Sequence, residues 1–174
     1  MITTNYQTAR DSIQDGDIVF IRDKPGILAK IIRKVTQSHY SHVGIAFWIE
    51  VQDTKRLMFA EAQGSTKRRI LNLSFYSPYE LDVVQSPKDW NLYYNDALAT
   101  IGQTKYNFLE AVYVGLRDLL MKKFGIKLSP KKFDGEICSE YVAREVGCFD
   151  VCVSPEGLFE ELINAGYPIK IQVR

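Results

Sequence analysis

The sequence predicts an α+β fold in which an antiparallel sheet packs against several helices. Short β-branched and aromatic runs, separated by turn residues, crowd the first half of the chain. Apolar residues at three- and four-residue spacing dominate the second half, where glycines stand at the expected helix ends. Because no internal repeat, linker or low-complexity tract divides these segments, we expect residues 1–174 to form one domain.

Five segments are expected to be strands, from their β-branched and aromatic content and bounding turns: 18–21, 42–51, 57–62, 81–84 and 169–173. Five are expected to be helices, from their apolar periodicity: 27–35, 89–102, 108–124, 137–146 and 155–165. The remainder is expected to be irregular. Residues 1–14 are interpreted as a polar lead-in with a short helix, and residues 63–78 as a loop. The basic cluster 67–69 within that loop is interpreted as a solvated turn.

In two of these segments, the sequence distinguishes an apolar side from the other side. Alternation in 42–51 places one set of apolar side chains on one face: Val43, Ile45, Phe47 and Ile49. The other face carries His42, Gly44, Ala46 and Trp48, and its small residues are expected to leave room for a group to approach the imidazole. Helix 108–124 is the longest amphipathic stretch, with an apolar side of Leu109, Val112, Tyr113, Leu116, Leu119 and Leu120.

Composition excludes several classes of protein. The chain has 174 residues, of which 46% are hydrophobic and 25% charged, as in ordinary globular domains. A formal net charge of +1 gives no global electrostatic reason to expect nucleic acid or an anionic membrane as a partner. No apolar run reaches the roughly 20 residues that span a bilayer, and the first residues lack a signal-peptide pattern. We therefore expect a cytoplasmic protein without a transmembrane segment.

The three cysteines, Cys138, Cys148 and Cys152, are too few for a disulfide framework. With only two histidines, both far away in sequence, a zinc site of four ligands is not expected, nor is any other metal or cofactor. Cys148 and Cys152 are interpreted as small, partly buried thiols.

Cys138 is the candidate nucleophile. The turn at Asp134 and Gly135 predicts a helix start, whose free N–H groups stabilise a thiolate. The polar residues Ser139 and Glu140 follow it, whereas a cysteine in a buried apolar stripe would have apolar neighbours. The alternative is that Cys138 is a small core residue, which is the commoner role of a lone cysteine.

His42 is the candidate base, and Glu61 the group that would orient its second ring nitrogen. Glu61 interrupts an apolar strand face, although it could also be the cross-strand partner of a surface lysine or arginine. The hairpin register that would bring Glu61 to His42 does not follow from the sequence. His39 is interpreted as a loop histidine. Tyr106 is a candidate to line a cleft or to donate to an oxyanion, the alternative being a core tyrosine.

Five short motifs occur in an order that resembles one known family. They are Gly16-Asp17-Ile18-Val19-Phe20, Tyr40-Ser41-His42-Val43-Gly44-Ile45, Ala60-Glu61-Ala62, Gly102 with Tyr106, and Cys138-Ser139-Glu140-Tyr141-Val142. Together they cover roughly residues 15–165. They are similar to the circularly permuted branch of the NlpC-type papain-fold cysteine hydrolases. These are the YiiX-like proteins, which are related in fold to lecithin retinol acyltransferase.

The resemblance implies a papain-like core, with a helix carrying the nucleophile packed on an antiparallel sheet carrying the base. Carried over by position, Cys138 is the nucleophile, His42 the base and Glu61 the third catalytic residue, with Tyr106 and Ser41 near the substrate. Asn107 departs from the pattern, since an aspartate is more usual there.

The function expected from the residues and the resemblance is a cysteine hydrolase acting through an acyl-enzyme. Its substrate would be an amide, as in a peptide, an isopeptide or a peptidoglycan fragment, or an ester such as an acyl lipid. Two alternatives remain: a non-catalytic peptide- or lipid-binding module on the same fold, and a thiol acyltransferase.

Overall fold

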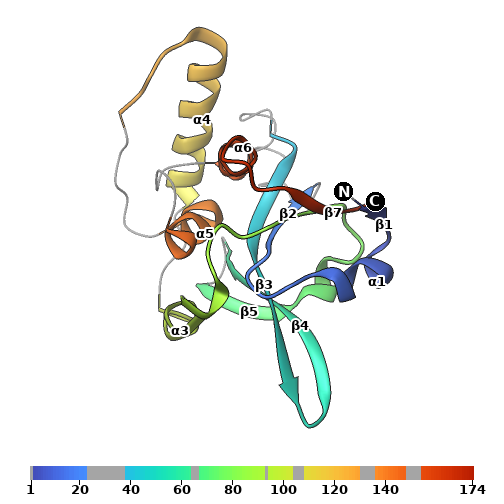
Figure 1. The fold of residues 1–174 in the computed structure, drawn as a ribbon. Helices are drawn as coiled ribbons and strands as arrows, with labels where there is room; N and C mark the ends of the chain where they lie inside the picture. Colours follow the sequence, from blue (N-terminus) through green and yellow to red (C-terminus); the bar gives the residue numbers. More distant parts are fainter. Residues whose placement is uncertain are drawn as a thin grey trace.

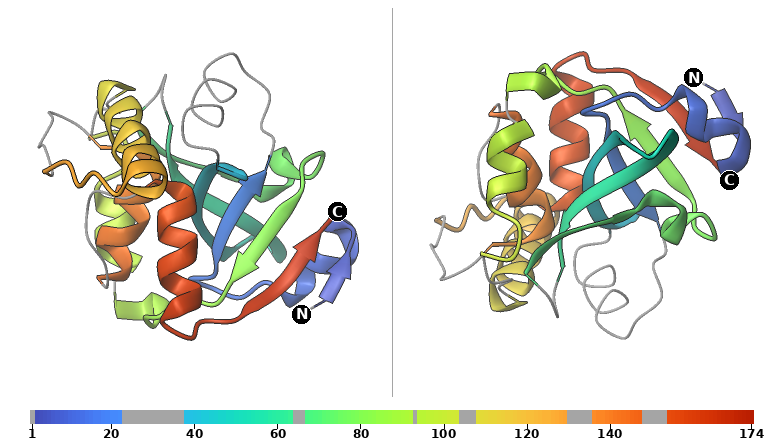
Figure 2. Two further views of the ribbon diagram at one scale, coloured as in Figure 1. Left: turned by 90° about the horizontal axis from the view of Figure 1, so that it is seen from above. Right: turned by 90° about the horizontal axis from the view of Figure 1, so that it is seen from below.

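The structure is a computed structural model that describes residues 2–22, 38–63, 67–92, 94–103, 108–129, 136–147 and 154–174. A twisted, mostly antiparallel sheet forms the centre of the molecule, and most of the helices lie along one side of it (Figure 1, Figure 2). The α+β class predicted from the sequence is confirmed.

The sheet has seven strands in the described part of the chain, in the order β1-β7-β6-β2-β3-β4-β5. Their bounds are β1 Ile2–Thr4, β2 Ile18–Arg22, β3 Tyr40–Val51, β4 Thr54–Ala62, β5 Arg68–Asn72, β6 Leu81–Val84 and β7 Ile169–Val173. Only the β1–β7 pair is parallel among these neighbours; the other pairs are antiparallel. All five predicted strands are present.

The helices are α1 Tyr6–Ala9, α3 Tyr94–Ala99, α4 Phe108–Phe124, α5 Cys138–Val146 and α6 Pro155–Asn164, with short 3-10 turns η1 Arg10–Ser12, η2 Leu73–Tyr76 and η3 Trp90–Leu92. Helices α3 to α6 lie on one side of the sheet, while α1 lies at the far edge beside β7 (Figure 2). The predicted helix 27–35 falls outside the described residues. Among the described helices, none combines the length and the apolar character that crossing a bilayer requires.

The β3–β4 hairpin carries two of the candidate site residues. Its turn is made by Gln52 and Asp53, which have φ angles of 48° and 59°. Two consecutive left-handed residues are typical of the tight turn whose twist matches a hairpin. Ile45 lies opposite Ala60 in this ladder. Because side chains alternate along a strand, this register places Glu61 on the same face as His42.

The two faces of β3 contribute to two separate cores, as the alternation predicted. Val43, Ile45 and Phe47 pack beneath α5 and α6. Ala46 belongs to the opposite core, which includes Phe59 and Tyr76. The sheet therefore holds α5 on one face and a tightly filled aromatic cluster on the other.

Two predictions about the loops were wrong. The segment 63–78 was predicted to be a loop, but it contains β5 and η2. The basic cluster 67–69 was predicted to be a solvated turn, but Arg68 is 3% exposed and its guanidinium lies over the ring of Tyr141 at 4.9 Å. The guanidinium also contacts Glu136 Oε2 at 2.8 Å. Arg68 and Arg69 are thus paired with carboxylates across the fold, whereas Lys67 is exposed as the prediction stated.

Two further elements differ from the prediction. Strand β1 was missed in the lead-in, because its partner β7 is at the opposite end of the chain. The segment 89–102 was predicted to be one helix, but it contains the 3-10 turn η3 and the short helix α3.

We predict that Gly44→Ala destabilises the fold. A Cβ at this position would lie 2.5 Å from both the Ala60 carbonyl oxygen and Phe59 Cζ, closer than any real contact. Overpacking of this kind costs about 1–3 kcal/mol of unfolding free energy, measured by urea denaturation. The matched control is Glu50→Ala at an exposed site of the same strand, expected to stay within about 0.5 kcal/mol. An unchanged unfolding free energy for Gly44→Ala would contradict the packing described.

Candidate active site

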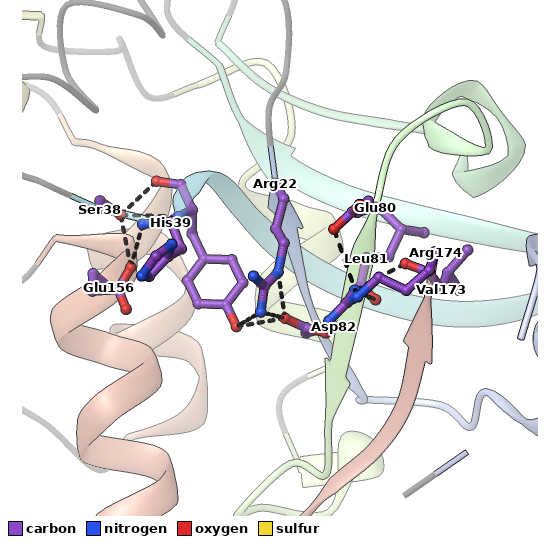
Figure 3. Close-up of polar contacts among 10 residues, drawn as sticks. Arg22, Ser38, His39, Glu80, Leu81, Asp82, Glu156, Val173 and Arg174 are labelled. Atoms are coloured by element: carbon purple, nitrogen blue, oxygen red, sulfur yellow. Dashed lines mark hydrogen bonds and ion pairs between the residues drawn. The ribbon is translucent and has the colours of Figure 1, made fainter. Parts of the chain in front are cut away.

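The first residue of β3 and the two residues before it are held by contacts with two other elements (Figure 3). On one side, Glu156 in the first turn of α6 accepts from the backbone N–H of His39 at 2.6 Å. The Ser38 hydroxyl lies 3.1 Å from the same carboxylate oxygen. On the other side, the Tyr40 hydroxyl donates to the buried Asp82 at 2.6 Å. The strand that carries His42 is thus held at its start by α6 and by β6.

Asp82 accepts the contacts on the β6 side, from Tyr40, Arg22 and Arg174. Arg22 Nη2 lies 2.6 Å from one carboxylate oxygen, and Arg174 Nη2 lies 2.8 Å from the other (Figure 3). Burial alone would raise the pKa of Asp82, but hydrogen bonds from Tyr40 and the two arginines lower it. The carboxylate therefore stays ionised, and it ties β2, β3, β6 and the chain end together.

His42 is buried on the Phe59 and Tyr76 side of β3. Its ring centroid lies 6.2 Å from that of Phe59 and 6.0 Å from that of Tyr76. Its Nε2 atom lies 2.6 Å from Glu61 Oε2. The hairpin register thus brings together the two residues that the sequence could not connect.

Glu61 is fully buried and has two further partners. Arg69 Nε donates to Oε1 at 2.6 Å, and the Tyr76 hydroxyl donates to Oε2 at 2.6 Å. Burial by itself would raise the pKa of this carboxyl. The positive charge and hydrogen bond of His42, followed by the hydrogen bonds from Tyr76 and Arg69, outweigh burial and lower the pKa to about 2.

Sequence reasoning missed both Arg69 and Tyr76. Arg69 lies directly opposite Glu61 in the β4–β5 ladder, so it is the cross-strand arginine of the alternative interpretation. The cross-strand contact is confirmed, and the two carboxylate oxygens also leave room for the contact with His42, while the orienting role of Glu61 stays a prediction. The segment Arg68-Arg69-Ile70-Leu71 does not alternate between charged and apolar residues, so the sequence contains little indication of a strand there.

Cys138 is the first residue of α5 and is 4% exposed. It lies close enough to the imidazole of His42 to influence the charge of that ring. Since Nε2 of the imidazole is taken by Glu61, Nδ1 is the nitrogen left for the thiol. Burial alone would lower the pKa of His42, but the charge of Glu61, then the charge and hydrogen bond of Cys138, raise it to about 9. At neutral pH the ring is therefore an imidazolium between two groups that favour its positive charge.

Glu140 caps the start of α5. Its Oε2 accepts from the Ile137 backbone N–H at 3.2 Å, just before the cysteine. Burial is the main cause that raises the pKa of Glu140 to about 8, and the charges of Glu110 and Glu136 add to it, against the hydrogen bond from Ile137. The raised pKa favours the neutral form of Glu140, whose carboxyl oxygen caps the helix just before Cys138.

The other candidate residues have less direct positions. The Ser41 hydroxyl donates to the Ile21 carbonyl at 3.2 Å, where the β2–β3 register shifts, and its contact with substrate stays a prediction. His39 is exposed, as expected of a loop histidine. Tyr106, with Asn107 beside it, lies outside the described residues, as do Cys148 and Cys152. The room expected beside His42 at Gly44 is filled by the Phe59 ring.

Comparison with known proteins connects the fold to one solved structure. No protein-family model and no curated protein matches the sequence. The fold is similar to that in the crystal structure of metalloprotein YiiX from Escherichia coli O157:H7, with a TM-score of 0.50. The match covers 92% of this chain and 96% of that one at 16% sequence identity. This chain has a YiiX-like fold. At this identity the similarity concerns the fold alone.

The residues of this YiiX-like fold do not suit a metal ion at the candidate site. Within the described ranges, no three or more His, Cys, Asp or Glu side chains are placed to hold a metal. The carboxylate of Glu61 already accepts from Arg69 and Tyr76. A cation there would face the Arg69 guanidinium and the imidazolium of His42. No step proposed below passes through a metal.

We predict that the imidazole of His42 titrates near pH 9 and that Glu61→Gln moves this titration to lower pH. The variant keeps the shape of the carboxylate but removes its charge, so the imidazolium loses its main support. The chain has only two histidines, so the NMR titration of the ring protons can be assigned with His39→Gln. A His42 signal that titrates near 6.5 in the native protein would contradict the buried pair.

The same shifts predict how stability depends on pH. Because the folded pKa of His42 is raised from 6.5 to about 9, its contribution is complete below pH 6.5 and is lost as pH rises through about 9. Because that of Glu61 is lowered from 4.5 to about 2, its contribution is lost only as pH falls through about 2. Urea denaturation on either side of pH 9 should therefore show a loss in the native protein that His42→Gln lacks. Equal losses in both would refute this linkage.

Proposed function

We propose that the protein is a cysteine hydrolase that cleaves an amide or ester bond through an acyl-enzyme on Cys138. The observation that supports this most strongly is the buried group Cys138, His42 and Glu61, in which His42 Nε2 lies 2.6 Å from Glu61 Oε2 and Cys138 lies close enough to raise the pKa of the imidazole. A thiol, an imidazole and a carboxylate in this order form an activated nucleophile with an oriented base.

In the first half of the reaction, the imidazolium of His42 stabilises the Cys138 thiolate. The sulfur attacks the substrate carbonyl carbon, a C–S bond forms, and the carbonyl electron pair moves to oxygen. The oxyanion collapses, the bond to the leaving group breaks, and His42 Nδ1 gives its proton to the departing amine or alcohol. The products of this half are the free leaving group and an acyl thioester.

In the second half, neutral His42 accepts a proton from water as the oxygen attacks the thioester carbon. The C–S bond then breaks, the acid is released, and the thiolate faces the imidazolium again. Glu61 supports both halves, because its charge favours the imidazolium and its hydrogen bond to Nε2 fixes the ring. Arg69 and Tyr76 keep that carboxylate in place.

The start of α5 offers a site for the oxyanion. Backbone N–H groups in the first turn of a helix have no intrahelical partner, and the helix dipole places positive potential there. The N–H of Cys138 is in this turn, so it is a donor to the negative oxygen of the tetrahedral intermediate. The substrates that match this chemistry are peptides, isopeptides, cell-wall peptide fragments and acyl esters.

We predict that Cys138→Ala and His42→Ala each reduce the release of p-nitrophenol from p-nitrophenyl acetate by at least about 100-fold. The native protein should also accumulate an acetyl group on Cys138, detected by mass spectrometry after an acid quench. The acetyl ester is a minimal probe of the nucleophile and makes no demand on the natural substrate site.

The matched controls are His39→Ala and the double variant Cys148→Ser/Cys152→Ser, which should retain the native rate. Native turnover in Cys138→Ala would overturn the mechanism. A native protein that binds acyl compounds but never acquires the acetyl group would contradict hydrolysis and favour a binding module.

A further inference from the structure

Exposed apolar side chains are concentrated on one element. The described part of the chain has seven large hydrophobic residues that are exposed, and five of them lie on α4 or just after it. These five are Leu109 at 68%, Leu116 at 41%, Met121 at 49%, Phe124 at 67% and Ile126 at 49%. The other two, Val51 and Phe75, lie in β3 and η2. Such a concentration marks an interaction surface more often than scattered single residues do.

Within the described residues, the buried apolar contacts of α4 come from its first half. Ala111 and Val114 contact Ile137, the residue before Cys138. The apolar side expected from the sequence is thus not the packed side. The second half extends beyond α6 and away from the sheet (Figure 1). On this half of the helix, Leu116, Met121 and Phe124 expose apolar surface between the charged residues of the sequence. A cluster of exposed apolar side chains is typical of an interaction surface.

The charges at the end of α4 identify the partner's chemistry. Residues 116–129 contain four basic residues, Arg117, Lys122, Lys123 and Lys127, and one acidic residue, Asp118. The side chains of Lys123 and Lys127 are exposed among the apolar ones. We call Leu116, Met121, Lys123, Phe124, Ile126 and Lys127 the α4 tip. A second copy packed symmetrically on the tip would bring its own lysines against these lysines, which opposes such a dimer.

An anionic lipid surface matches both properties of the tip. Aromatic and aliphatic side chains enter the boundary between headgroups and acyl chains, while lysines remain at the level of the negative headgroups. Each lysine close to an anionic surface adds attraction. We propose that the α4 tip docks the protein on anionic membrane surfaces. The docking goes beyond the hydrolysis proposed above and does not depend on it.

The test is flotation of the full chain with vesicles of phosphatidylcholine, either pure or containing about one third phosphatidylserine. The native protein should bind the anionic vesicles at least tenfold more tightly than the neutral ones. Leu116→Gln/Phe124→Gln should lose at least tenfold of the binding to anionic vesicles, and Lys123→Gln/Lys127→Gln about tenfold. Glutamine is a good helix former and these sites are exposed, so both variants should unfold like the native protein.

Matched control variants distinguish vesicle binding by the α4 tip from nonspecific binding by other exposed residues. Val51→Gln/Phe75→Gln removes the two exposed apolar residues elsewhere, and Lys55→Gln/Lys67→Gln removes two exposed lysines of other segments. Both should bind anionic vesicles within about twofold of the native protein, as should Cys138→Ala. Failure of the native protein to float would overturn the proposal, as would equal losses in the controls. A native dimer abolished by Leu116→Gln/Phe124→Gln, without vesicle binding, would assign the tip to a second copy instead.

Discussion

The arrangement depends on a buried carboxylate that is held ionised. Removing a charge from water is costly, so Glu61 is tolerated only because His42, Arg69 and Tyr76 together satisfy its two oxygens. These partners come from three different elements, β3, β5 and η2, so the carboxylate also fixes how the elements meet. The free-energy cost of burying the Glu61 carboxylate is offset by these contacts. Its pair with His42 keeps the imidazole charged and aligned, and the proposed chemistry needs that alignment.

A second buried network holds the helix that begins with Cys138, the proposed nucleophile. Arg68 in β5 contacts Glu136 just before α5 at 2.8 Å, and Glu145 near the end of that helix at 3.6 Å. Arg144 contacts Glu136 at 2.6 Å on the outer side. The neighbouring arginines of β5 therefore have separate tasks. Arg69 holds the carboxylate that contacts His42, while Arg68 holds the helix that begins with Cys138. One strand thus links both halves of the proposed site.

Local patterns predicted most of the elements. The strand 42–51, its hairpin and the helices that begin near residues 108, 138 and 155 follow from periodicity and turn residues, which depend only on neighbours in sequence. The candidates Cys138, His42 and Glu61 came from residue chemistry together with a family resemblance. The existence of β1 and the placement of Arg68 could not be predicted, because both depend on partners that are far away in the chain.

The contact between Glu61 and His42 shows the same limit at the site itself. Alternation assigns a side chain to one of two faces, but it does not fix the register between strands, and a slip of one residue would turn Glu61 away. The register seen here, with Ile45 opposite Ala60, is set by the packing of both cores and by the tight turn at Gln52 and Asp53. The direction in which α4 packs is likewise a tertiary property. Its apolar pattern predicted a helix but not which side would meet the protein.

The most direct test of the central claim is the rate at which iodoacetamide alkylates Cys138, followed by mass spectrometry from about pH 5 to pH 10. A thiolate stabilised by the imidazolium of His42 should react rapidly even below pH 7, and His42→Ala should slow that reaction at least tenfold, whereas His39→Ala should not. The same rate and the same pH profile in the native protein and in His42→Ala would contradict the account, because the imidazole would then have no influence on the sulfur.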